Sequence, residues 1–151
     1  MNRPAASQSG IPPAPRPEEI TVAIRFDLDV VAARRQARAL AARVGFSASE
    51  ITLIATAVSE LARNILLYAQ SGMIAFQFIE QRGRRGIGIT ARDHGPGIPD
   101  LELALQDGYS SARGLGLGLP GVRRLMDDFE IQSQPGFGTR VVVKKWLGNG
   151  P

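Results

Sequence analysis

The strongest constraint on the fold is a long segment of helical periodicity that begins after Ser47. Ser47 and Ser49 are both good N-cap residues, and Glu50 stands three positions after Ser47, as a capping box requires. We therefore expect a helix from about Ala48 to Ala69. At 100° per residue, its apolar side chains gather on one side: Ile51, Ile54, Val58, Leu61, Ala62, Ile65 and Ala69. A helix with such a stripe must pack against a second layer.

The segments around this helix predict a sheet. Alternation or β-branched content typical of strands is found in residues 21–26, 73–80, 86–92, 130–133 and 139–146. Further helices are expected from Asp27 or Asp29 to about Val44, over about 100–106, and from the glycine-rich stretch 114–121 to about Asp128. Because most strands follow the two long helices, we expect an α+β fold with one mixed, mostly antiparallel sheet and helices on one face.

The chain of 151 residues is expected to form one domain. Residues 1–19 are rich in proline, alanine and serine, which predicts a disordered tail. The folded domain is expected over residues 20–147, with a short tail at 148–151. We find no internal repeat.

Composition excludes several classes of function. With no cysteine and one histidine, His94, disulfides and a transition-metal cluster are excluded. No run of eighteen apolar residues occurs, and no apolar stretch follows a basic start, so we expect no spanning helix, no signal peptide, no membrane partner and a cytoplasmic location. The net charge of +4 suits an anionic ligand such as a nucleotide. Basic residues stand only in short groups, which favours solvated surface over a nucleic-acid patch.

Glu60 and Asn64 lie four residues apart, on the side of the long helix opposite the apolar stripe. Leu53 and Leu67 share that side, which favours a face lining a partly closed pocket. Mg²⁺ accepts an Asn carbonyl oxygen beside phosphates and water, and a neighbouring Glu can take the proton of an attacking hydroxyl. The pair therefore suits phosphoryl transfer or hydrolysis at a Mg-bound nucleotide. The same pair on a solvated helix face would have no role.

Two glycine-rich segments follow. In Asp93-His94-Gly95-Pro96-Gly97-Ile98, directly after a strand, the Asp can accept from an amine such as that of adenine, and the glycines admit a flat ring. A tight turn with a capping Asp would explain the same residues. The second segment, 114–121, precedes a helix and suits phosphate oxygens, with Ser110, Ser111 and Arg113 as further donors. No strand leads into its GxGxxG pattern, so we reject a dinucleotide site, and the sequence has no P-loop.

The order and spacing of these segments resemble the GHKL ATPases. Ser59 to Asn64 is similar to their N box, 93–98 to the G1 box, 114–121 to the G2 lid, and Gly136-Phe137-Gly138-Thr139 to the last box. The resemblance covers about 20–146 and implies a Bergerat α/β sandwich. Within the superfamily the chain resembles the RsbT-type switch kinases of bacterial partner-switching systems, on three further segments: 108–111, 125–129 and 144–146.

This resemblance implies an ATP-dependent serine/threonine protein kinase. Glu60 would be the catalytic base, Asn64 the Mg²⁺ ligand and Asp93 the adenine ligand. The remaining nucleotide contacts would be Gly95, Gly97 and Thr139 at the adenine, and Gly114, Gly116 and Gly118 over the phosphates, with Arg113 beside them. The implied substrate is a serine or threonine on a small STAS-domain protein, as in the stressosome scaffold. The released kinase would then activate a downstream phosphatase, with the PP2C type as a candidate.

Two other functions stay open at the level of sequence. Anti-sigma factors use the same ATP-binding fold to sequester a sigma factor and to phosphorylate its antagonist. A plain interaction module that has lost turnover is the third alternative. The intact Glu60, Asn64 and Asp93 argue against the module, and the Gly-Leu run that ends in Pro120 and Gly121 favours the kinase.

Overall fold

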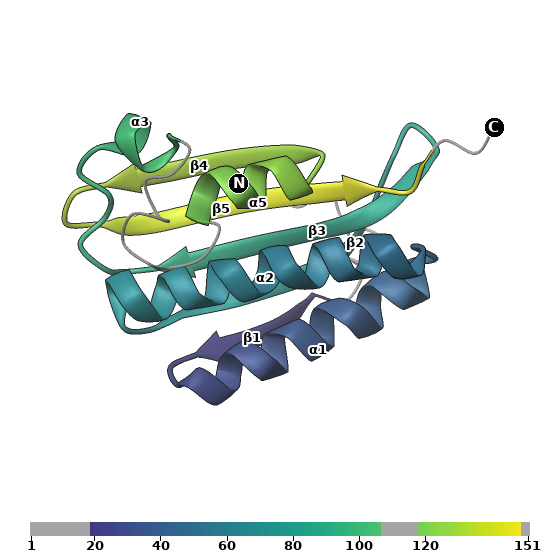
Figure 1. The fold of residues 1–151 in the computed structure, drawn as a ribbon, viewed down its shortest axis with the longest axis horizontal. Coiled ribbons are helices and arrows are strands. Elements are labelled where there is room, and N and C mark those ends of the chain that lie inside the picture. Colours follow the sequence, from purple (N-terminus) through teal and green to yellow (C-terminus); the bar gives the residue numbers. More distant parts are fainter. Residues whose placement is uncertain (1–18, 107–117, 149–151) are drawn as a thin grey trace, which may run out of the picture.

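A five-stranded sheet with helices on one face forms the part of the chain that the computed structural model describes, residues 19–106 and 118–148 (Figure 1). The strands are β1 (Ile20–Ile24), β2 (Gly72–Gln81), β3 (Arg84–Asp93), β4 (Asp128–Gln134) and β5 (Gly138–Trp146). The helices are α1 (Asp27–Val44), α2 (Ala48–Ala69), α3 (Leu101–Ala104) and α5 (Gly118–Leu125). In Figure 1, α1 and α2 cover the half of the sheet that contains β1 to β3, and α5 covers β4 and β5.

The strand order is β1-β2-β3-β5-β4, and all four pairings described are antiparallel. The predicted α+β class with helices on one face is confirmed, and the described pairings include no parallel pair. Because β3 and β5 are neighbours, Asp93 at the end of β3 lies directly opposite Thr139 at the start of β5. Two glycine-rich segments far apart in the sequence therefore meet at one end of the sheet.

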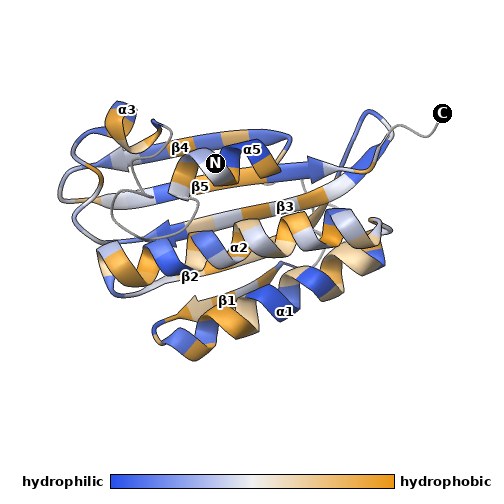
Figure 2. Ribbon diagram, viewed as in Figure 1, coloured by the Kyte–Doolittle hydropathy of each residue, from blue (hydrophilic) through white to orange (hydrophobic). Residues whose placement is uncertain are grey.

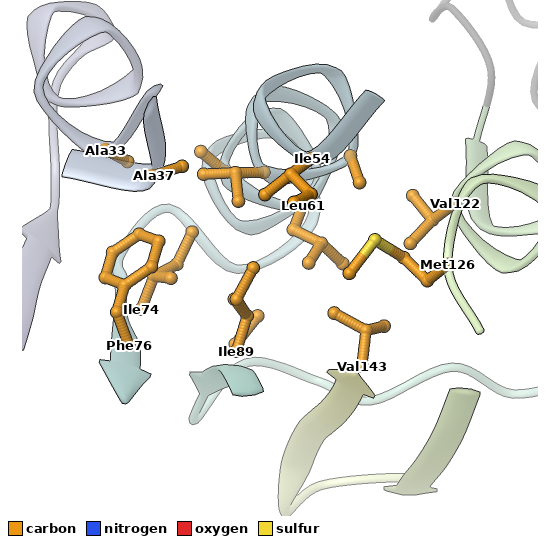
Figure 3. Packing of buried hydrophobic residues seen from close by; sticks show 14 of the residues in the cluster. Ala33, Ala37, Ile54, Leu61, Ile74, Phe76, Ile89, Val122, Met126 and Val143 are labelled. Atoms are coloured by element: carbon orange, nitrogen blue, oxygen red, sulfur yellow. The ribbon is translucent and has the colours of Figure 1, made fainter. Parts of the chain in front are cut away.

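The apolar stripe of α2 forms the centre of the core. Ile54 and Leu61 are fully buried, and in Figure 3 they face Ile89 of β3, with Val143 of β5 beyond. Val122 of α5 closes the same cluster from the other side. Each such side chain contributes roughly 1.5–3 kcal/mol on burial. Figure 2 shows hydrophobic and hydrophilic turns alternating along α1 and α2, as expected for helices with one buried face.

The predicted start of α2 is confirmed in detail. The Ser47 hydroxyl accepts from the Glu50 N–H at 3.2 Å, and the Ser47 N–H donates to Glu50 Oε1 at 3.1 Å. Among the described residues, α2 is the one helix long and apolar enough to cross a membrane by length and composition alone. Most of its apolar stripe, including Ile54, Leu61 and Ile65, instead lies in the core, as in the central helix of a folded domain.

The predicted end of the last helix near Asp128 is wrong, because α5 ends at Leu125. The Asp127 carboxylate accepts from the Trp146 N–H, and the Asp128 carboxylate from the Trp146 indole N–H, each at 2.8 Å. Lys145 Nζ donates to the Leu125 carbonyl at 2.9 Å. These bonds to β5 draw both aspartates out of the helix, and β4 begins at Asp128 rather than at residue 130.

The first strand is also shorter than predicted and ends at Ile24. The Asp29 carboxylate accepts from the backbone N–H groups of Arg25 and Phe26, each at 2.8 Å, and so begins α1 directly after the strand. These two backbone bonds hold the pKa of Asp29 below its ordinary value of 3.8. The predicted tails 1–19 and 148–151 lie outside the described residues, apart from Glu19 and Gly148.

Candidate functional site

A cavity of about 410 Å³ opens at the end of the sheet where β3 ends and β5 begins. Its walls come from the second half of α2, the loop after β3, β5 and the first turn of α5. The apolar lining includes Leu61, Ile65, Ile98, Leu119 and Val141, and the polar lining Asn64, Asp93 and Thr139. An apolar cleft with a few convergent polar groups is the usual form of a small-molecule site.

Asp93 and Thr139 stand side by side at this end of the cavity, because they are cross-strand partners of β3 and β5. Asp93 Oδ1 accepts from the Gly95 N–H at 2.9 Å, which fixes the start of the loop. No donor among the described residues bonds the second carboxylate oxygen. An ionised carboxylate has acceptor positions only, so this oxygen can accept from a donor in the cavity, such as an amine on a flat ring.

The loop after Asp93 is packed too closely for side chains at its glycines. Gly97 has φ +82, and an added Cβ would overlap the Gln134 carbonyl. An added Cβ at Gly95 would stand 2.5 Å from the Ala69 Cβ, at the end of α2. The Gly136 N–H donates to the Pro96 carbonyl at 2.7 Å. The loop is therefore held between α2 and the β4–β5 turn.

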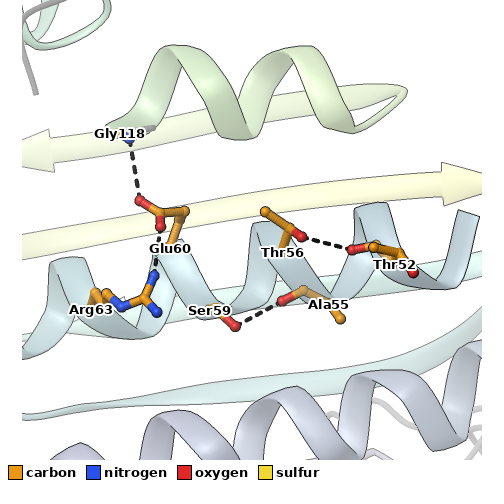
Figure 4. A network of polar contacts seen from close by, with 7 residues as sticks. All are labelled: Thr52, Ala55, Thr56, Ser59, Glu60, Arg63 and Gly118. Atoms are coloured by element: carbon orange, nitrogen blue, oxygen red, sulfur yellow. Dashed lines mark hydrogen bonds and ion pairs between the residues drawn. The ribbon is translucent and has the colours of Figure 1, made fainter. Parts of the chain in front are cut away.

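The two polar residues predicted on α2 have different surroundings. Asn64 lines the cavity, whereas Glu60 does not and is only 5% exposed. Glu60 lies below the first residue of α5: its Oε1 accepts from the Gly118 N–H at 3.4 Å, and its Oε2 from Arg63 Nη1 at 2.7 Å (Figure 4). A buried carboxylate is tolerated only with such partners. The prediction that both residues stand at the cavity wall is therefore correct for Asn64 alone.

The prediction that two leucines of α2 share this wall is wrong. Leu53 and Leu67 are 38% and 49% exposed, and neither lines the cavity. Tyr68, an aromatic residue, also lines the wall and was not predicted from the sequence. Tyr68 follows Asn64 by four residues, as Asn64 follows Glu60, so the helical spacing could have identified it.

Ser133 is the second residue missed. It lies on β4, outside the cavity, and its hydroxyl accepts from the Ile98 N–H at 2.7 Å. The same hydroxyl lies 2.8 Å from Thr139 Oγ1. No sequence pattern indicated this contact, because it joins positions 35 residues apart.

The structure thus brings together Asn64, Asp93, Gly97 and Thr139 around one cavity. Gly95 packs against the end of α2, and the Gly118 N–H donates to Glu60. His94 is exposed and does not line this cavity, as expected for a loop residue. The other predicted phosphate-side residues, Ser110, Ser111, Arg113, Gly114 and Gly116, lie outside the described residues.

Residues 25–145 match the model of the histidine kinase-like ATPase domain, and the chain belongs to this family, as the GHKL resemblance predicted. The chain is 47% identical over 130 residues to the serine/threonine-protein kinase RsbT of Bacillus subtilis (strain 168), covering 86% of this chain and 98% of the relative. This match confirms the predicted likeness to the RsbT-type switch kinases.

Anti-sigma F factors are also similar to the chain. That of Thermoanaerobacter sp. (strain X514) is 33% identical over 122 residues, 78% of this chain and 85% of the relative. That of Geobacillus stearothermophilus is 31% identical over 120 residues, 75% of this chain and 81% of the relative.

The matching family is an ATPase domain, and membership of it implies that the chain binds ATP.

Proposed function

We propose that this chain is an ATP-dependent serine/threonine protein kinase of a bacterial partner-switching pathway. The observation that carries the proposal is the 47% identity to the kinase RsbT over nearly that protein's whole length. The cavity supports it, since Asn64 faces the space beside Asp93 and Thr139 and follows the buried carboxylate of Glu60 by one helical turn.

The cavity has the chemistry to hold an adenine ring. The Asp93 oxygen that no described residue bonds would accept from the exocyclic amine, and Thr139 would lie beside it. Ile65, Ile98 and Val141 supply apolar walls for the ring faces. The glycines at 95 and 97 keep the loop backbone close to the ring, and we assign the phosphates to Arg113 and the glycines at 114, 116 and 118.

Transfer needs a metal ion and a base. Mg²⁺ takes oxygen ligands and few protein atoms, so the Asn64 side-chain oxygen together with phosphate oxygens and water fits it, and the ion would neutralise charge on the phosphates. Glu60 would accept the proton of the substrate hydroxyl while the hydroxyl oxygen bonds to the γ-phosphorus and ADP departs. Glu60 Oε1, which accepts from the Gly118 N–H at 3.4 Å, has a further acceptor position that the substrate hydroxyl would use.

For the protein partners we propose a STAS-domain substrate, as in a stressosome scaffold, and a phosphatase of the PP2C type that the released kinase activates in the cytoplasm. The name of the relative supports the kinase activity, and the partners follow from the resemblance to switch kinases. An anti-sigma factor is the second candidate, favoured by the relatives that are 33% and 31% identical. The match to the kinase RsbT has higher identity and coverage than the matches to the anti-sigma factors, and so favours a kinase.

The test is incubation of the chain with Mg-ATP and each candidate STAS protein, followed by intact-mass measurement. One added phosphate on a STAS protein, with Glu60→Gln inactive, is the expected result. Sigma factors are tested in parallel for stable binding with ADP or ATP. Tight capture of a sigma factor would make the chain an anti-sigma factor, and unmodified STAS proteins with no ATP bound would refute the kinase proposal.

A further inference from the structure

The solvent side of α2 carries two large apolar side chains and an arginine on one line. Leu53 and Leu67 are 38% and 49% exposed, and the Arg63 side chain is 54% exposed. At 100° per residue, these three positions and the half-buried Thr56 fall within about 80° of one another. In Figure 4, Thr56 and Arg63 lie on either side of Glu60 along the helix. We call this line of four residues the α2 strip.

Glu60 separates the strip from the nucleotide cavity. Asn64 and Tyr68, which line the cavity, are turned from Glu60 by about 40° and 80° in one sense. Leu67 and Arg63 are turned by about 20° and 60° in the other sense. In phosphoryl transfer the attacking and leaving oxygens lie roughly in line, on opposite sides of the phosphorus. With the nucleotide in the cavity, a protein that presents its hydroxyl to Glu60 would approach from the solvent side of α2, where the strip lies.

Arg63 has hydrogen-bond donors that the described part of the chain does not use. Its Nη1 donates to Glu60 Oε2 at 2.7 Å, and no other acceptor among the described residues bonds the side chain. A guanidinium carries five N–H donors in a planar fork that fits a carboxylate in bidentate geometry. Because more than half of the side chain is exposed, its other donors can bind an anionic group of a partner while the bond to Glu60 is kept.

The two leucines extend this surface along the helix. Single exposed leucines are common on protein surfaces. Here Leu53 and Leu67 stand fourteen residues apart, about 21 Å along α2, with the arginine between them. Arginine is enriched in the surfaces through which proteins bind one another, and apolar contacts form the buried centre of such surfaces. The strip therefore suits a protein segment that has both an acidic and an apolar side chain.

We propose that the α2 strip binds the segment of the substrate protein that contains the phosphorylated serine or threonine. An acidic side chain of that segment pairs with Arg63, and apolar side chains pack on Leu53 and Leu67. Arg63 is thus a specificity-determining residue, which selects substrates with an acidic residue beside the hydroxyl. This inference rests on the proposed function, because it takes the partner to be the protein whose hydroxyl is phosphorylated.

The experiment uses a STAS protein that the wild-type chain phosphorylates, and measures the KM for that protein, the rate at saturating protein and the ATP affinity. Leu67→Ala should raise the KM roughly tenfold through lost apolar contact. The rate at saturation and the ATP affinity should not change, because Leu67 does not line the cavity. Met73→Ala is the matched control, since Met73 is 46% exposed and its strand neighbour Ile74 faces the core, which places Met73 on the other face of the sheet.

Arg63→Gln tests the charge. Glutamine can still donate to Glu60 Oε2, but it lacks the charge and the planar fork. The KM for the STAS protein should rise roughly tenfold, and by a larger factor than any fall in the rate at saturation. A variant with a lower rate at saturation and an unchanged KM would overturn the proposal, because Arg63 would then only hold Glu60.

Variants of the substrate give a second check. Each aspartate or glutamate near the phosphorylated residue is replaced by its amide. One replacement should raise the KM of the wild-type kinase and have no further effect on Arg63→Gln, whereas additive effects at every position would contradict the pairing. An unchanged KM in both Leu67→Ala and Arg63→Gln would overturn the α2 strip. A wild-type chain that phosphorylates no STAS protein would refute the proposed function itself, a result distinct from transfer with an unaltered KM.

Discussion

The two ends of the cavity are built by different means. At the Asp93 end, backbone packs on backbone, so that a Cβ added at Gly138 would overlap the Asp93 carbonyl. At the α5 end, Glu60 is held by a 3.4 Å hydrogen bond from Gly118 and by Arg63, whose side chain is 54% exposed. The geometry for binding therefore depends on contacts that also form the fold. The chemistry depends on side chains that can be replaced without unfolding it.

Glu60→Gln tests the α5 end and should give the largest effect. Glutamine cannot accept the substrate proton at a useful pKa, and loss of a base lowers the rate by ~10²–10⁴. The fold should survive, because the glutamine carbonyl can still accept from the Gly118 N–H and Arg63 can turn to water. Single-turnover phosphotransfer, ATP affinity and thermal melting measure the three quantities.

The matched control is Glu130→Gln, an exposed acid on β4, which should leave all three quantities unchanged. Full-rate transfer by Glu60→Gln would remove Glu60 as the base. A large loss of ATP affinity or stability would show that this end of the cavity is built like the other, and the contrast between them would be wrong.

Gly138→Ala tests the other end, with Gly136→Ala as its partner in the same turn. Both glycines have positive φ, +105 and +85, so an alanine strains the backbone at each by roughly 1 kcal/mol. Only Gly138 would also bring its Cβ onto Asp93, which should cost a further ~2 kcal/mol of unfolding free energy and weaken ATP binding. Denaturant titration measures the unfolding free energy of the two variants, and equal losses would contradict a close approach at Gly138.

The elements that the sequence predicted well are those fixed by local chemistry. The bounds of α2 follow from the Ser47 capping box and an apolar stripe of helical period, and both signals lie within the helix itself. The bounds around Asp127 could not be found in this way. They depend on hydrogen bonds from Trp146, 18 and 19 residues further along, which only the folded sheet brings into reach.

The candidate site shows the same division. Asn64, Asp93 and Thr139 were each predicted from a motif, and the antiparallel pairing of β3 with β5 brings the last two together. Ser133 was missed because its role comes entirely from the β4–β5 register. Leu67 was wrongly assigned to the cavity, because an apolar residue on a polar helix face does not show which part of that face is covered.

Asp93→Asn separates binding from folding at the Asp93 end. The asparagine oxygen can still accept from the Gly95 N–H, so the loop and the melting temperature should be retained. Its amide group would set a donor against the adenine amine, and ATP affinity should fall about tenfold or more. Calorimetry measures the affinity, with Asp27→Asn, an exposed residue of α1, as the control. An unchanged affinity would refute the assignment of adenine to Asp93.

Asp29→Asn should give the smallest effect, far from both ends of the cavity, and tests whether a local cap behaves independently of the site. The backbone bonds from Arg25 and Phe26 hold the pKa of Asp29 below 3.8, so its carboxylate stabilises the folded state at pH values above that range. This contribution is lost as the pH falls through the folded-state pKa. The variant should therefore melt slightly below wild type at pH 7, and the two melting temperatures should converge as the pH is lowered below 3.8. ATP affinity at pH 7 should not change. A difference in melting temperature that stayed constant down to acid pH would show that the ionised carboxylate is not what begins α1.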